Sequence, residues 1–193
     1  MTEPSQRNGI KDLLFHPPGQ VPVAPRGDAP LFRAIFSRKG KEAPDLLQFL
    51  AGIALFEMLE PKELKKVCAM VHERTYQAGE LIFEQGTPGS AMYIIRSGAV
   101  EVFRQDAAGH PLMRLALLRE GAFFGEDSLL DEDLRFISTR AVEATDALAF
   151  FRADLDQIIA RMPVTGNKIL RKVAWVTARR LEAVIDELYR AKE

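Results

Sequence analysis

The stretch that decides the fold is YQAGELIFEQGTPGSAMYIIRSGAVEVF, residues 76–103. Glycines at positions 86, 89 and 98 separate three short runs, LIFEQ, AMYIIRS and AVEVF, which are rich in β-branched, aromatic and aliphatic residues. Runs of this length bounded by glycine are typical of short strands in antiparallel sheets. The pattern continues in LMRLALL, FISTRAVE and ALAFF. We therefore predict six or more strands that form a β-barrel or jelly roll.

Helical periodicity flanks the predicted strands on both sides. It begins at Asp45 with LLQFLAGIALFEML and continues in PKELKKVCAMVHE, where Pro61 stands at a first helical position. After the strands, RADLDQIIARM predicts a short helix that Pro163 stops, and a long helix is expected over residues 164–190. The predicted fold is α+β: a jelly roll (double-stranded β-helix) flanked by N-terminal helices and a long C-terminal helix.

The long C-terminal helix carries two apolar stripes. One stripe alternates steps of four and three residues: Leu170, Ala174, Thr177, Leu181, Val184 and Leu188. The other stripe consists of Ile169, Val173 and Val176. A helix with two such stripes needs two partners, and we expect these to be its own domain and a second copy of the chain, in a homodimer. The alternative is a helix that lies wholly on its own domain.

Residues 1–44 differ in composition from residues 45–193. They hold most of the 11 prolines and more Lys and Arg than Asp and Glu, so we predict a flexible, basic, proline-rich arm that contacts a protein partner. Within the arm, LFRAIFSRKGK (residues 31–41) places apolar residues at helical spacing beside basic ones. This segment is either a short helix that covers the domain or a peptide that docks on a protein or a membrane surface.

Composition argues against several classes of protein. A formal net charge of −1 does not favour broad electrostatic capture of nucleic acid. The single Cys68 suits a reducing compartment, and the sequence shows neither a signal peptide nor a transmembrane segment, so a cytoplasmic location is expected. His16, His72 and His110 do not form a metal-ligand spacing with Cys68, and no catalytic constellation is evident. We expect no metal and no enzymatic activity.

The stretch AFFGEDSLLDEDLRFIST, residues 122–139, raises a question of chemistry. It places a lone Arg135 after an acidic loop and nine residues beyond Glu126. Arg135 either holds an anion that is not a side chain or is an ordinary loop residue paired with Asp131 or Asp133. A guanidinium can bind a phosphate through two parallel hydrogen bonds, and Gly125 would let the backbone come close to such an anion.

These features together resemble the cyclic-nucleotide-binding domain family, the sensor domain of catabolite-activator-like regulators. The resemblance rests on Gly79, Gly86, Gly89 and Gly98, on GAFFGEDSLL as the start of a phosphate-binding cassette, and on the position of Arg135. It covers roughly residues 46–190.

The resemblance implies a site. Arg135 would pair with a cyclic phosphate, and Glu126 would accept a hydrogen bond from the ribose 2′-hydroxyl. The predicted ligand-binding set is Gly125, Glu126, Arg135, Phe136 and Ser138. The expected ligand is cAMP, cGMP or another cyclic nucleotide, with no other cofactor, and the expected function is a non-catalytic regulatory module that senses the nucleotide and signals through its C-terminal helix.

Two departures keep an alternative open. Phe136 and Ile137 stand where nucleotide-binding members carry small residues, and Val184 and Ile185 stand where catabolite-activator-type proteins present Thr and Ser to adenine. The alternative is therefore a degenerate domain without a ligand that acts as an adaptor or subunit of a protein complex. Regulators of this type that bind DNA place a helix-turn-helix after the long helix, and this sequence shows none, so no direct DNA binding is expected.

Overall fold

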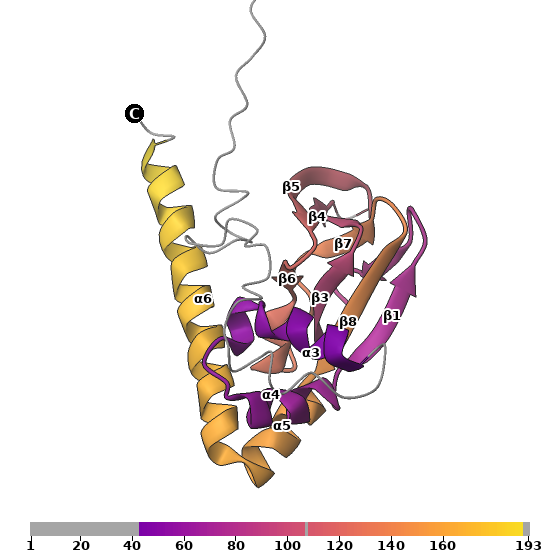
Figure 1. The fold of residues 1–193 in the computed structure, drawn as a ribbon. Helices are drawn as coiled ribbons and strands as arrows, with labels where there is room; N and C mark the ends of the chain where they lie inside the picture. Colours follow the sequence, from indigo (N-terminus) through magenta and orange to yellow (C-terminus); the bar gives the residue numbers. More distant parts are fainter. Residues whose placement is uncertain (1–42, 107, 191–193) are drawn as a thin grey trace, which may run out of the picture.

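The computed structural model describes residues 43–106 and 108–190, and its strands form two four-stranded antiparallel sheets (Figure 1). The strands are β1 (His72–Tyr76), β2 (Leu81–Phe83), β3 (Ala91–Ser97), β4 (Ala99–Gln105), β5 (Pro111–Arg119), β6 (Phe123–Phe124), β7 (Ser138–Ala141) and β8 (Thr145–Phe151). The sheet orders are β1-β8-β3-β6 and β2-β7-β4-β5. The predicted jelly roll is confirmed, as two packed sheets rather than a closed barrel.

Burial of apolar residues explains the central strands. In β3 and β4, apolar side chains face the interior and polar ones lie at intermediate or exposed positions. Gly98 joins the two strands with φ +86°, and a Cβ there would lie 2.5 Å from the carbonyl oxygen of Ala144. Only glycine meets both requirements, so this turn depends on its residue type.

The described helices are α3 (Ala43–Ala51), η1 (Ala54–Phe56), α4 (Pro61–Cys68), α5 (Arg152–Arg161) and α6 (Pro163–Arg190). The expected helix in LLQFLAGIALFEML is interrupted near Gly52 and resumes as the short 3₁₀ helix η1. Pro163 ends α5 and also begins α6, because proline suits the first helical turn, whose N–H groups have no partner inside the helix. The long helix therefore starts one residue earlier than predicted.

One strand was wrongly predicted as helix. The helical pattern assigned to PKELKKVCAMVHE ends at Cys68, and His72–Tyr76 forms β1. This strand lies at the edge of its sheet, where it pairs only with β8 among the described strands. Its side chains are mostly exposed, so the sequence HERTY carries no alternation of apolar and polar residues that would have revealed it.

Two apolar clusters form the core. The first joins the helices to the sheet that contains β3 and β8, and its members include Leu50, Phe56, Val67, Met92, Phe150, Ile158, Ile169, Val173 and Val176. The second contains residues of both sheets: Ile95, Val100, Val102, Ala116, Leu118, Ala122, Phe124 and Ile137. The predicted inner stripe of α6 is thus confirmed as core.

Polar contacts also hold the first half of α6 against the N-terminal helices. Lys168 Nζ lies 2.6 Å from Glu63 Oε2, and Lys172 Nζ lies 2.5 Å from Glu57 Oε1. Leu170, which was predicted to lie in the outer seam, packs partly buried against the first core cluster, so it belongs to its own domain. The second half of α6 leaves Leu181, Ile185 and Leu188 exposed.

Two expectations remain, one on the N-terminal arm and one on membrane spans. The flexible arm and its protein partner were assigned to residues 1–44, which lie outside the described residues except for the first two residues of α3. None of the helices in the described part of the chain is long and apolar enough to cross a membrane.

Candidate functional site

The candidate site is built from two backbone segments that are far apart in the sequence. Strand β6 leads to Gly125 (φ +74°) and then to the 3₁₀ helix η2 (Glu126–Leu129). The chain returns beside the 86–89 loop, where Arg135 N donates to Thr87 O at 2.8 Å and Gly86 N donates to Arg135 O at 2.7 Å. These two bonds fix the backbone of Arg135 on both sides. We call residues 125–135 the cassette.

Arg135 is buried, with 4% of its surface exposed. Its Nη2 donates to Ala91 O at 2.5 Å and its Nη1 donates to Gly125 O at 3.3 Å. Its Cζ lies 4.0 Å from the centroid of the Phe83 ring. Its Nε is buried and finds no hydrogen-bond acceptor among the described residues. The expectation of a loop arginine paired with Asp131 or Asp133 is therefore wrong.

Another arginine holds the acidic loop instead. Arg152, at the start of α5, donates to Asp131 O at 2.6 Å and to Glu132 Oε1 at 2.8 Å. Arg152 thus holds the acidic loop through one backbone carbonyl and one carboxylate, while Arg135 bonds to backbone carbonyls in the interior.

The charge of Arg135 sits in an unfavourable environment. Burial lowers the pKa of its guanidinium below the ordinary value, while the charges of Asp127, Tyr93 and Glu126 oppose that shift. Removal of a cation from water is costly unless an anion or hydrogen bonds replace the lost hydration. A bound anion would meet this need.

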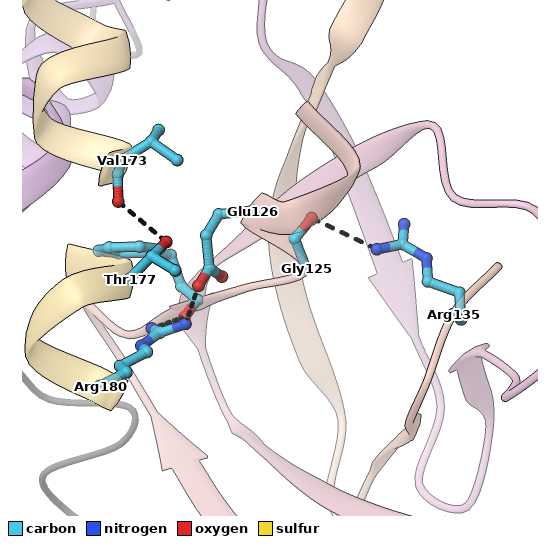
Figure 2. Close-up of polar contacts among 7 residues, drawn as sticks. Gly125, Glu126, Arg135, Val173, Thr177 and Arg180 are labelled. Carbon is cyan, nitrogen blue, oxygen red and sulfur yellow. Dashed lines mark hydrogen bonds and ion pairs between the residues drawn. The ribbon is translucent and has the colours of Figure 1, made fainter. Parts of the chain in front are cut away.

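Glu126 links the cassette to the long helix (Figure 2). Its buried Oε1 forms an ion pair with Arg180 Nη1, and Arg180 Nη2 donates to Phe123 O at 3.1 Å. Its second oxygen, Oε2, is also buried and has no hydrogen-bond donor within the described part of the chain. Figure 2 shows Glu126 and Arg135 on the two sides of Gly125.

Glycines border the guanidinium of Arg135. A Cβ on Gly125 would lie 2.6 Å from Arg135 Nη1, and a Cβ on Gly89 would lie 2.1 Å from Ser128 Oγ and 3.2 Å from Arg135 Nε. Both positions therefore require glycine because the arginine and η2 pack directly against the backbone.

The other predicted site residues lie differently. Phe136 is 58% exposed, so its ring does not fill the buried space beside Arg135. Ile137 packs in the second core cluster. Ser138 is buried, accepts a hydrogen bond from Gln85 N at 2.8 Å and donates to Gln105 Oε1 at 2.7 Å. The structure brings Gly125, Glu126 and Arg135 together, while ligand contact by Phe136 and Ser138 stays a prediction.

Sequence reasoning missed Arg180 and Phe83. A signal for Arg180 exists: the buried stripe Ile169, Val173, Val176 advances by four and three residues, and the next step of four reaches Arg180. An arginine at the end of a buried stripe is expected to have a carboxylate partner on the facing element. Phe83 gave no signal, because its contact with Arg135 joins residues of different strands and loops.

Comparisons with known proteins agree with this geometry. The family described as "Cyclic nucleotide-binding domain" matches residues 73–162. A cyclic AMP receptor protein of Thermus thermophilus is 40% identical over 139 residues, which are 72% of this chain and 62% of that protein.

Two solved structures are similar to the described fold. The catabolite activator protein of Thermus thermophilus has a TM-score of 0.63 at 40% identity, over 72% of this chain and 63% of the other. A cyclic nucleotide-binding domain from Methylobacillus flagellatus has a TM-score of 0.64 at 28% identity, over 77% of this chain and 83% of the other. In both comparisons with Thermus thermophilus, the chain spans less than two thirds of the length of the matched protein. Residues 73–162 of the chain match the cyclic nucleotide-binding domain family.

Proposed function

We propose that the chain is a non-catalytic regulatory module that binds a cyclic nucleotide in the cassette and signals its presence through α6. One observation carries this proposal: Arg135 Nε and Glu126 Oε2 are a buried donor and a buried acceptor without partners among the described residues. A buried polar group without a partner costs about 1–3 kcal/mol. A cyclic nucleotide supplies both missing partners, since its phosphate accepts hydrogen bonds and its ribose 2′-hydroxyl donates one.

The route to α6 follows from the ion pair of Glu126. A ribose hydroxyl that donates to Glu126 changes the environment of the carboxylate that holds Arg180. Arg180 stands one residue before Leu181, where the exposed apolar seam of α6 begins. Ligand binding would thus alter the position or order of the segment that carries Leu181, Ile185 and Leu188. This seam is the surface on which we propose a second copy of the chain to pack, in a parallel homodimer.

Calorimetric titration of the full chain with cAMP and cGMP tests the binding step. Arg135→Ala should weaken binding at least 100-fold, because charge-assisted hydrogen bonds contribute about 1.5–3 kcal/mol each and 1.4 kcal/mol is about tenfold in affinity. Arg152→Ala is the matched control, since Arg152 holds the same loop from outside and makes its contacts with Asp131 and Glu132. It should bind the nucleotide as the wild type does.

An adaptor without a ligand is the second candidate function. The observation that favours it is that both Nη atoms of Arg135 already donate to backbone carbonyls, of Ala91 and Gly125. In an adaptor these bonds would be the only role of the arginine. A wild-type chain that shows no heat of binding with cAMP, cGMP or a cyclic dinucleotide would support this function and contradict the first.

A further inference from the structure

We infer that Phe83 is a positioning residue for the nucleotide: its ring holds the Arg135 guanidinium so that Nε is presented to the phosphate while Nη2 stays bonded to Ala91 O. This inference rests on the proposed function and assigns the nitrogen of the arginine that the ligand takes and the residue that orients it. Three observations support it: the hydrogen bonds of the guanidinium, the glycine backbone beside it and the position of the Phe83 ring.

The hydrogen bonds of the guanidinium are unequal. Nη2 makes a short bond of 2.5 Å to Ala91 O, Nη1 makes a long bond of 3.3 Å to Gly125 O, and Nε has no acceptor among the described residues. Hydrogen bonds weaken as the donor and acceptor separate beyond about 3.2 Å. An incoming phosphate oxygen therefore displaces no hydrogen bond at Nε, while Nη2 stays bonded to Ala91.

Glycine backbone borders two nitrogens of the guanidinium. A Cβ on Gly89 would lie 3.2 Å from Nε, and a Cβ on Gly125 would lie 2.6 Å from Nη1. Side chains at either residue would fill the space beside those two nitrogens. Glycine at both positions therefore spares Nε, the nitrogen without an acceptor, from crowding by a further side chain.

The face of the guanidinium rests on Phe83. Arg135 Cζ lies 4.0 Å from the ring centroid, within the range in which a cation is attracted to an aromatic face. The ring is itself held by neighbours: Tyr93 lies 6.0 Å and Phe124 lies 5.8 Å away, centroid to centroid. With this ring in place the guanidinium plane is fixed. Without it, one strong hydrogen bond to Ala91 remains and the plane can turn about that bond.

The test is the affinity of three variants for cAMP and cGMP, measured by titration calorimetry on the full chain. Phe83→Leu should bind about tenfold more weakly, an effect within the range of a desolvated cation–π contact. Phe83→Tyr keeps the aromatic face and should restore affinity to within about twofold of the wild type.

Phe103→Leu is the matched control. Phe103 also lies in the core beneath an arginine, with Arg140 Cζ 5.2 Å from its ring, but that arginine pairs with Glu101 rather than with the cassette. Phe103→Leu should lower the melting temperature, as Phe83→Leu does, yet leave the affinity unchanged. A purely structural role for Phe83 would make the two leucine variants behave alike. If Phe83→Leu does not fold, Phe83→Met tests the same loss of the ring with a more adaptable side chain.

The outcomes separate the two proposals. A wild type that binds a cyclic nucleotide, together with a Phe83→Leu or Phe83→Met variant that binds equally well, overturns this inference and leaves the proposed function intact. Equal weakening by Phe83→Leu and Phe83→Tyr also overturns it, because the ring would then not be the group that matters. A wild type that binds no cyclic nucleotide overturns the proposed function and this inference with it.

Discussion

At the scale of single residues, the site depends on charges that the fold has removed from water. Arg135 and Glu126 are both buried, and each keeps one polar atom without a partner in the described part of the chain. Globular proteins rarely leave such atoms unsatisfied, and where they do, a ligand or a water molecule often supplies the partner. This is the physical basis for reading the cassette as a binding site rather than as a surface loop.

Glu63 predicts a pH dependence of stability. Burial raises the pKa of its carboxyl, but hydrogen bonds from Lys168, Glu60 and Thr165 together lower it below the ordinary value of 4.5. Because the folded pKa is the lower one, the carboxylate stabilises the fold above pH 4.5, and this stabilisation is lost as the pH falls through the folded pKa. Urea unfolding should show Glu63→Gln less stable than the wild type at pH 7, with a smaller difference at pH ~3.

The control for Glu63 is Glu73→Gln. Glu73 lies on the exposed strand β1 and pairs with Arg96 of β3. An exposed ion pair of this kind contributes about 0–1 kcal/mol. A Glu63→Gln variant that loses stability between pH 7 and pH ~3 as steeply as the wild type would contradict the prediction.

Cys68 predicts slow thiol chemistry. Burial raises the pKa of its thiol from 9.0 to about 11, so very little thiolate exists at pH ~8. Labelling with a disulfide reagent at that pH should be at least tenfold slower in the native protein than in urea. Equal labelling rates in both conditions would show that the fold neither shields the thiol nor raises its pKa.

At the scale of secondary-structure elements, the main finding is the contact between α6 and the cassette. The first half of α6 is fixed by its apolar stripe and by Lys168 and Lys172. Arg180 then reaches from α6 to Glu126 and to the carbonyl of Phe123 (Figure 2). The helix that carries the exposed seam is thus joined to the cassette by a largely buried ion pair.

Removal of one partner of this ion pair should strongly destabilise the fold. Arg180→Met leaves Glu126 buried beside an apolar side chain, and such changes typically destabilise by about 3–5 kcal/mol. For a chain of this size we expect the melting temperature to fall by about 10 °C. The double variant Arg180→Met with Glu126→Gln should recover part of the loss, because no uncompensated charge is left. Differential scanning calorimetry measures both changes.

Arg179→Met is the control for Arg180. Arg179 stands next to it on α6 and pairs with Glu182 in an exposed i, i+3 contact. Exposed pairs of this kind contribute only a few tenths of a kcal/mol, so the melting temperature should hardly change. A similar fall for Arg179→Met and Arg180→Met would remove the argument for a special contact at the cassette.

At the scale of the whole molecule, α6 extends past the other helices with one face exposed (Figure 1). Leu181, Ile185 and Leu188 are 59%, 43% and 60% exposed and follow one another at steps of four and three residues. This spacing is typical of a helix that packs along another helix. The structure shifts the predicted seam, since Ile185 is exposed where Val184 had been expected and Leu170 belongs to the core.

The homodimer is testable by light scattering. We expect the wild type to be dimeric at micromolar concentration and Leu181→Asp to be monomeric, because the substitution places a charge without a partner in an apolar contact. Leu81→Asp is the control, since Leu81 is an exposed leucine on β2, outside the seam. A monomeric wild type, or loss of the dimer in both variants, would contradict a dimer built on α6.

Much of this protein was determined by the sequence alone, because the relevant patterns are local. Short runs rich in β-branched, aromatic and aliphatic residues, separated by glycines, predicted the sheets, and the inner stripe of α6 predicted its buried face. The importance of glycine at position 125, whose φ is +74°, also followed from residue type. Each of these features depends on residues that are close together in the sequence, either because they share one face of an element or because one residue type tolerates a given backbone angle.

Other features were decided only by tertiary structure. The edge strand β1 forms because β8 offers it a partner, although its own residues carry no pattern. Arg135 is buried because it bonds to the carbonyls of Ala91 and Gly125 and packs on Phe83. The adjacent acidic loop is bonded to Arg152 instead. Arg180 reaches Glu126 across 54 positions of sequence. Contacts between distant segments depend on the packing of whole elements, and no local pattern of residues records which side chains that packing brings together.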